Sequence, residues 1–146
     1  MKRLLFDTCF LKALYTPTDQ YNRQAKEIWE MICRAESKIL IPYPVLYETL
    51  KTEFIKNKTG MEYFNRLIRK CERVELVCDS LYRKDALFDT LNIGSNQKVS
   101  MVDRILILMA EKRELNINGI VSFDVRDLSE YCRKRNILFV NSKGYL

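Results

Sequence analysis

Short apolar runs alternate with helical periodicity along this chain, and this alternation restricts its fold more than any other feature. Between the runs, apolar residues recur at spacings of three and four, as on one face of an amphipathic helix. The runs are short enough for buried strands and lie at residues 3–6, 39–41, 74–77, 120–123 and 137–140. Strands that alternate with helices predict an α/β fold with a mainly parallel central sheet of four to five strands and helices on both faces.

Seven helices are expected between these strands. Pro42 and Pro44 fit the start of a helix, since proline is tolerated in a first helical turn, and Thr59–Glu62 has the pattern of a capping box. Residues 92–98 carry glycine, serine and asparagine and are expected to form an exposed loop. The helices are expected before Thr16, over 21–35, from Pro44 through Phe54, from Thr59 to Cys71, and over 80–91, 101–110 and 128–135.

Length and composition predict one domain over residues 1–146. A chain of 146 residues with 47% hydrophobic residues can bury a core of its own, and four glycines and three prolines leave little room for a linker. Two basic residues and only three apolar ones separate Met1 from Asp7, which is neither a signal peptide nor a membrane span. We therefore expect a cytoplasmic protein with no membrane partner.

The number of histidines and cysteines limits which metal sites and which kinds of catalysis are possible. The chain has no histidine, and its five cysteines form no C-x-x-C pair, so a zinc site is not expected. The cysteines are expected to be reduced thiols packed as small apolar side chains. Hydrolytic chemistry must then depend on carboxylates, a metal ion or both.

The formal net charge of +6 and the pI of about 9.1 favour a polyanionic partner such as nucleic acid. The alternative is that the basic residues form solvated helix faces. They gather in two clusters, one of Lys51, Lys56, Lys58, Arg66, Arg69, Lys70 and Arg73, the other of Arg133, Lys134 and Arg135.

Four separated carboxylates stand where an α/β fold exposes side chains. Asp7 and Asp124 follow the first and fourth apolar runs, so both are expected at the carboxyl ends of strands, where open sheets bind ligands. Glu48 and Asp103 are expected in the opening turns of two helices. Four acids in one cleft repel one another, and a divalent cation commonly holds such groups ionised together. The pattern therefore predicts a metal site.

Most of these acids also have a structural interpretation. Asp7 could cap the helix that follows it, and Glu48 could be an ordinary carboxylate on a helix surface. Asp103 closes a variant capping box with Ser100, and Asp127 fits the cap of the helix after it. Asp124 precedes that cap and has no such local role.

Taken together, these residues resemble the PIN-domain ribonucleases, in particular the VapC toxins of toxin-antitoxin modules, over essentially the whole chain. Cys9 stands where that family often has asparagine, Leu128 where it often has phenylalanine, and residues 51–98 match no motif. The matching motifs are Leu4-Leu5-Phe6-Asp7-Thr8, Val45-Leu46-Tyr47-Glu48, Ser100-Met101-Val102-Asp103-Arg104-Ile105-Leu106 and Ser122-Phe123-Asp124-Val125-Arg126-Asp127-Leu128.

The resemblance implies a PIN-like three-layer sandwich and a hydrolase that cuts RNA phosphodiester bonds with Mg²⁺ or Mn²⁺. Catalysis would depend on Asp7, Glu48, Asp103 and Asp124, with Asp127 as a further metal ligand. The resemblance also implies a homodimer and an antitoxin encoded beside it.

Two other functions stay open at this point. One is a nucleic-acid-binding module of the same fold without catalysis, in which the acids are caps or remnants. The other is a phosphotransfer domain with Asp7 as phospho-acceptor. Phosphatases of the haloacid dehalogenase type have a second aspartate where this chain has Cys9. Receiver domains have acidic residues where it has Leu4–Phe6.

Overall fold

The computed structural model describes residues 1–92, 99–125 and 128–142. In these parts of the chain five strands form one sheet in the order β3-β2-β1-β4-β5, and every neighbouring pair is parallel. The predicted parallel α/β architecture is confirmed. The strands are β1 (Arg3–Phe6), β2 (Lys38–Pro42), β3 (Val74–Val77), β4 (Gly119–Val121) and β5 (Leu138–Val140).

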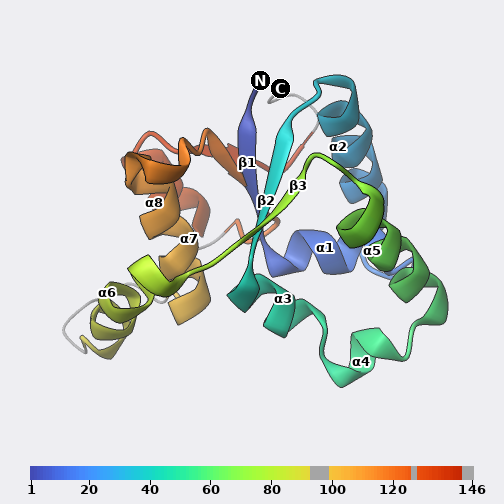
Figure 1. Ribbon diagram of the computed structural model, residues 1–146, viewed down its shortest axis with the longest axis horizontal. Coiled ribbons are helices and arrows are strands. Elements are labelled where there is room, and N and C mark those ends of the chain that lie inside the picture. The colour runs from blue at the N-terminus through green and yellow to red at the C-terminus, as the bar shows by residue number, and fades with distance from the viewer. Residues whose placement is uncertain (93–98, 126–127, 143–146) are drawn as a thin grey trace.

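Helices cover both faces of the sheet and give three layers. Helices α1, α2 and α5 lie on one side of the sheet, and α6, α7 and α8 lie on the other (Figure 1). The helices are α1 (Thr8–Tyr15), α2 (Asn22–Arg34), α3 (Tyr43–Thr49), α4 (Thr52–Ile55), α5 (Lys58–Lys70), α6 (Ser80–Leu91), α7 (Met101–Glu111) and α8 (Leu128–Lys134), with a 3₁₀ turn at Arg113–Leu115.

Strand β1 lies at the centre of the sheet and of the core. Leu4, Leu5 and Phe6 have no exposed surface, which contributes roughly 1.5–3 kcal/mol for each side chain. The Phe6 ring meets the rings of Phe10 and Trp29 edge to face, at centroid distances of 4.7 and 6.2 Å. These contacts fix α1 and α2 against the strand that leads directly into Asp7.

Three local predictions differ from the structure. The helix expected from Pro44 through Phe54 is broken, because Leu50 leaves the helical region with φ −86° and ψ 42°, so that α3 and α4 are separate. Helix α5 begins two residues earlier than Thr59–Glu62 predicts, because Asn57 caps it by accepting a hydrogen bond from Gly60 N–H. Strand β4 ends at Val121, so Asp124 follows it after two intervening residues.

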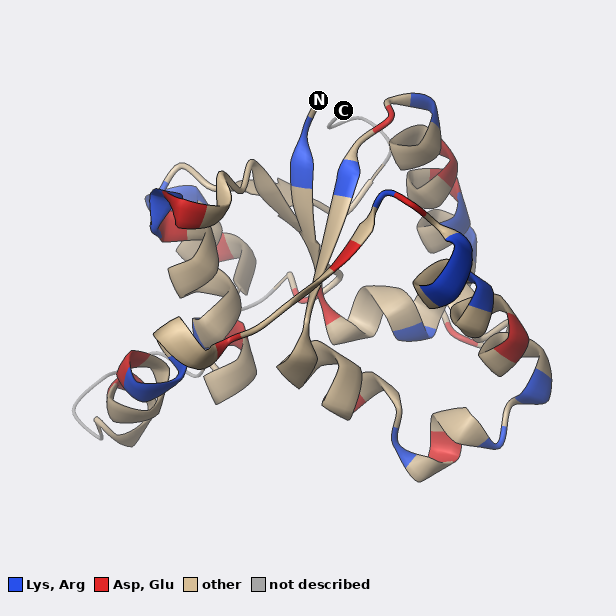
Figure 2. Ribbon diagram, viewed as in Figure 1, with Lys and Arg blue, Asp and Glu red and all other residues tan. Residues whose placement is uncertain are grey.

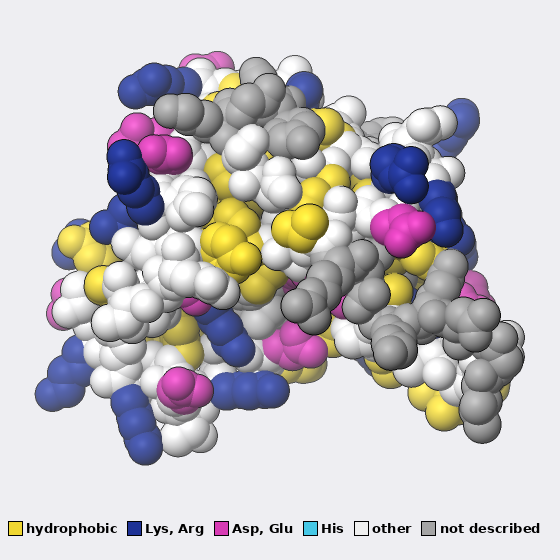
Figure 3. Space-filling view, turned by 180° about the vertical axis from the view of Figure 1, so that it is seen from behind, with side chains coloured by type: hydrophobic (Ala, Val, Ile, Leu, Met, Phe, Trp, Pro, Cys, Tyr) yellow, Lys and Arg dark blue, Asp and Glu magenta, His cyan; other side chains and the backbone are white. Residues whose placement is uncertain are grey.

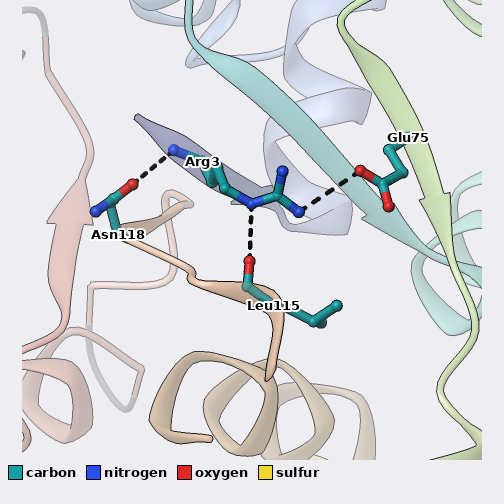
Figure 4. A network of polar contacts seen from close by, with 4 residues as sticks. All are labelled: Arg3, Glu75, Leu115 and Asn118. Atoms are coloured by element: carbon teal, nitrogen blue, oxygen red, sulfur yellow. Dashed lines mark hydrogen bonds and ion pairs between the residues drawn. The ribbon is translucent and has the colours of Figure 1, made fainter. Parts of the chain in front are cut away.

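A polar network closes the amino end of the sheet (Figure 4). Arg3 donates through Nε to the Leu115 carbonyl at 2.8 Å and through its backbone N–H to Asn118 Oδ1 at 2.7 Å. Its guanidinium also lies 3.6 Å from the Glu75 carboxylate, a half-exposed pair that contributes little by itself. The network joins β1, β3 and the turn before β4 at the end of the sheet away from Asp7.

The strand order creates a switch point between β1 and β4. The chain runs from β1 to β2 and β3 on one side of β1, whereas β4 and β5 lie on the other side. Open parallel sheets bind ligands at such a switch point, outside the carboxyl ends of the strands. Asp7 and Asp124 follow the two strands that meet there. None of the helices in the described ranges is long and apolar enough to cross a membrane.

Candidate active site

Asp7 is held by the end of the β1–β4 ladder. Phe6 is in register with Val121, and the Asp7 N–H donates to the Val121 carbonyl at 3.1 Å. The carboxylate caps α1 by accepting from Thr8 N–H at 2.7 Å, and Ser122 Oγ donates to its other oxygen at 2.6 Å. Asp7 therefore caps a helix, as one interpretation of the sequence holds, and it also faces the switch point.

Glu48 is brought to the same place by α3, which starts directly after β2. Pro42 precedes the helix in an extended conformation, and Pro44 lies in its first turn. The Thr8 hydroxyl donates to Glu48 Oε2 at 3.0 Å. This bond ties the second acid to the residue that follows the first, and it links the ends of two neighbouring parallel strands.

Asp103 lies in the first turn of α7. Ser100 caps this helix, and its Oγ accepts from the Asp103 N–H at 3.1 Å, as the capping box predicts. Most of α7 is apolar and packs against the sheet, with Ile105, Leu106 and Met109 among its buried residues. The cap and the buried helix body together direct Asp103 toward the switch point.

Asp124 is fixed through the segment after β4. Its backbone N–H donates to Ser122 Oγ at 3.0 Å, and Phe123 is buried between aromatic rings. The Phe123 ring stacks on Tyr21 at 4.6 Å and lies 5.9 Å from Phe10. Because Phe123 is anchored on both sides, the following aspartate is held at the edge of the sheet.

All four carboxylates line one open pocket of about 340 Å³. Asp7 is buried, and the other three are half-buried. Asp127, the fifth predicted metal ligand, lies outside the described residues. The remaining lining residues are Thr8, Cys9, Lys12 and Ser100.

The acids influence one another's protonation. Burial, together with the charges of Asp7 and Asp124, raises the pKa of Asp103 to about 7, although the Ser100 hydrogen bond opposes these effects. Burial also raises the pKa of Asp7, against the hydrogen bonds from Ser122, Thr8 and Cys9. In the absence of a cation the pocket therefore favours the protonated forms of Asp7 and Asp103, as expected where acids are crowded and partly desolvated.

The donor set of this pocket fits a hard divalent cation, because carboxylate and hydroxyl oxygens are the ligands that Mg²⁺ and Mn²⁺ prefer. A cation would also offset the repulsion that raises the pKa of Asp103. In their present positions, however, no three acidic or thiol side chains of the described residues are close enough together to hold one ion. Metal binding would thus require the side chains of the half-buried acids to turn inward.

Cys9 takes a polar place in this site, which its expected role as a packed thiol did not predict. Its thiol donates to Asp7 Oδ2 at 3.3 Å, and its sulfur accepts from Phe123 N–H at 3.2 Å. Burial and the charge of Asp7 raise the pKa of Cys9 to about 12, so the group stays a neutral thiol. All five cysteines are free. Cys132 is fully buried, as expected for a packed thiol, whereas Cys78 is exposed and does not fit that expectation.

Lys12 was not among the predicted site residues. It follows Thr8 by one helical turn, so the spacing in the sequence would have placed it on the same face of α1 as the pocket. The basic residues of the two clusters predicted from the sequence do not line the acidic pocket. Many are on α5, where Lys58, Arg66 and Arg69 are exposed to solvent (Figure 2).

Comparison with solved structures gives a match across most of the chain. The structure of VapC20 from Mycobacterium tuberculosis, a sarcin-ricin loop cleaving toxin, superposes with a TM-score of 0.64 and 21% sequence identity. The match covers 87% of this chain and 93% of VapC20. This chain has a PIN-like fold.

The PIN-like fold is established by shape, since sequence alone gives little support. No protein-family model matches the chain, and no curated protein matches it at a significant level. At 21% identity the likeness to VapC20 concerns the fold.

Proposed function

We propose that this protein is a metal-dependent endoribonuclease that hydrolyses RNA phosphodiester bonds. The observation that carries the proposal is the convergence of Asp7, Glu48, Asp103 and Asp124 on one open pocket at the switch point of a PIN-like sheet. These residues come from four separate segments of the chain. Capping and surface exposure explain some of them one at a time, but neither explains why they meet.

In this proposal the four carboxylates hold Mg²⁺ or Mn²⁺, with Asp127 as a further ligand. A bound divalent ion supplies a water of lowered pKa and neutralises charge on the phosphate. The chain contributes oriented ligands: the Thr8 hydroxyl fixes Glu48, and the Ser122 hydroxyl fixes both Asp7 and the backbone of Asp124. Ordered carboxylates lose less entropy when they bind the ion and the substrate.

The chain's positive charge supports RNA as the substrate. With a net charge of +6, the surface outside the acidic pocket attracts a polyanion, and binding should weaken with salt. Acidic and basic side chains lie next to one another near the middle of the face in Figure 3. Carboxylates with basic side chains around them can bind a phosphodiester once a cation neutralises the charge of the carboxylates.

The biological role that fits this proposal is that of a toxin in a type II toxin-antitoxin pair. Its support is the resemblance of the motifs around the four acids, together with the fold shared with the toxin VapC20. The role includes a cognate antitoxin, a homodimer and action in the cytoplasm. A small gene next to this one that encodes a DNA-binding protein would favour it.

The experiment that tests the nuclease is cleavage of a structured RNA pool by the purified protein with Mg²⁺ or Mn²⁺, compared with EDTA. Asp7→Asn and Asp103→Asn are the variants, and circular dichroism verifies that they fold. We expect metal-dependent cuts that both variants lose by at least about 100-fold, since each removes a charged ligand. Equal cutting by either folded variant would contradict the mechanism.

A second candidate is a PIN-like module that binds RNA without cutting it. One observation favours it: no three side chains of the described residues are arranged to hold a metal ion as they stand. The cleavage experiment separates the two candidates. A folded protein that binds RNA but leaves it intact with either metal would support the binding module.

A further inference from the structure

A second cavity, of about 510 Å³, adjoins the acidic pocket. Lys12 lines both spaces and is the residue they share among their lining residues. The loop 16–19 between α1 and α2 forms one wall of the second cavity, and Lys51 and Glu53 form another. Phe54, only 6% exposed, provides an apolar surface. An extended ligand could therefore occupy both spaces and pass Lys12.

The Lys12 side chain is available to such a ligand. It is half-buried, yet its ammonium group makes no hydrogen bond or ion pair with any residue in the described ranges. The Lys12 ammonium therefore lies more than 4 Å from the carboxylate oxygens of the four acids that line the same pocket, which is unusual for a lysine in such surroundings. A lysine ammonium is a compact charge with three donors and is well suited to a phosphate oxygen.

The second cavity combines polar groups that are fixed by hydrogen bonds with polar groups that are free to contact a ligand. Thr49 and Asn57 are fixed, because the Thr49 hydroxyl donates to the Val45 carbonyl and the Asn57 amide donates to Tyr15. Among the described residues, the side chains of Thr16, Thr18, Lys51 and Glu53 have no hydrogen-bond partner.

This mixture suits a nucleoside better than another phosphate. Lys12 and Lys51 balance Asp19 and Glu53 in charge, so the cavity is no strong anion site, whereas Phe54 offers an apolar contact and the threonines offer donors and acceptors. Base recognition in single-stranded RNA uses such a combination of apolar contact and hydrogen bonds to base edges. The volume lies within the range of small-molecule sites.

We propose that the second cavity is the subsite for one nucleotide of single-stranded RNA, next to the phosphate that is cut. Lys12 binds the phosphodiester that connects this nucleotide to the acidic pocket. The inference rests on the proposed ribonuclease function. It adds that the nucleotide must be unstacked to enter, and that the residues of the cavity influence which sequences are cut.

The first test measures binding without cleavage. Anisotropy of a labelled, short single-stranded RNA pool of mixed sequence is followed with Ca²⁺, which offsets the charge of the acids, for wild type, Lys12→Met and the control Lys2→Met. Methionine keeps the unbranched stem of lysine and removes its charge. Lys2 is exposed and lies at the amino end of β1, opposite the pocket.

For Lys12→Met we expect about 3–10-fold weaker binding and a salt slope smaller by about 0.7, the value for one lost phosphate contact on a single strand. Lys2→Met should bind within twofold of wild type. Equal affinity and equal salt slope for wild type and Lys12→Met would overturn the assignment of Lys12. Because no cleavage is measured, this result does not depend on the nuclease.

The second test fills the cavity. Thr18→Trp puts a bulky ring on its wall, and Thr52→Trp makes the same change on α4 at an exposed residue that lines neither space. Cut sites in the RNA pool are mapped with metal. We expect Thr18→Trp to change the nucleotide preference at one position beside the cut, and Thr52→Trp to keep the wild-type pattern.

The outcomes separate this inference from the nuclease proposal. If wild type cuts RNA and Thr18→Trp gives an unchanged pattern, the nucleotide subsite is refuted and the nuclease stands. If wild type cuts nothing while Lys12→Met binds RNA more weakly, the nuclease fails and Lys12 stands as an RNA contact. If wild type does not bind RNA at all, both fail.

Discussion

Ser122 Oγ donates a 2.6 Å hydrogen bond to Asp7 Oδ2, although the two residues are 115 positions apart in the sequence. The same oxygen accepts the Asp124 N–H at 3.0 Å. Ser122 has no exposed surface, so one buried hydroxyl connects two of the four acids. Its loss should affect the acidic pocket more than the fold.

Ser122→Ala should lower the rate of RNA cleavage by at least about 10-fold, because Asp7 Oδ2 loses its hydroxyl donor and keeps only the weaker thiol donor of Cys9. It should also cost about 1–3 kcal/mol of stability, the usual penalty for a buried polar group left without its partner. Steady-state kinetics should show the loss in kcat rather than KM, and urea denaturation gives the stability. Ser122→Thr keeps the hydroxyl and should retain more activity. Equal kcat for Ser122→Ala and wild type would refute this role.

Cys9→Ser should behave like wild type, whereas Cys9→Ala should cleave more slowly. A hydroxyl can replace the thiol as donor to Asp7 and acceptor from Phe123, but a methyl group can do neither. We expect a reduction of about 3–10-fold for Cys9→Ala, with the melting temperature used to correct for stability. Similar rates for the two variants would mean that the sulfur merely fills space.

Asp103→Asn should stabilise the metal-free protein at pH 8 and have little effect at pH 4. The folded-state pKa of Asp103 is about 7, above the unfolded value near 3.9, so the folded protein binds more protons between these values. Wild-type stability therefore falls as pH rises from about 4 through 7, and the asparagine variant lacks this contribution. Each kilocalorie per mole regained should raise Tm by about 3 °C in a domain of this size.

Thermal unfolding in EDTA at a series of pH values measures this effect. Asp19→Asn is a suitable control, since Asp19 lies outside the acidic pocket and lines only the neighbouring cavity. If Asp103→Asn and wild type show the same pH dependence of Tm, the carboxyl group does not titrate in the folded protein as described.

Gly119→Ala should destabilise the protein by roughly 1–3 kcal/mol, the usual cost of overpacking. A Cβ atom at Gly119 would lie 2.7 Å from the Leu138 carbonyl oxygen, so β4 and β5 would have to separate. Urea denaturation measures the change. Undiminished stability would show that the two strands can move apart without cost.

The sequence predicted the sheet because its central strands are buried on both faces and form uninterrupted apolar runs, as Leu4–Phe6 and Ile39–Ile41 do. It predicted the convergence of Asp7 and Asp124 because the carboxyl ends of parallel strands share one edge. The fold comparison confirms this architecture, while the catalytic role of the acids stays a prediction.

The features missed by the sequence analysis depend on contacts between distant segments. The apolar spacing continues through Leu50, so nothing local indicated the break between α3 and α4. The polar role of Cys9 exists only because the β1–β4 register places Ser122 beside it. Lys12 could be placed on a face of α1, but its position between two cavities depends on how the loops 16–19 and 51–53 fold.

The acidic pocket draws its residues from both ends of the chain, with Asp7 in the first strand-to-helix turn and Asp124 beyond the fourth strand. A nascent chain that has not yet passed Ser122 lacks both Asp124 and the hydroxyl that holds Asp7. Synthesis must therefore pass Asp124 before all four acids can meet, and truncation upstream of Ser122 removes one acid together with the hydroxyl that holds another.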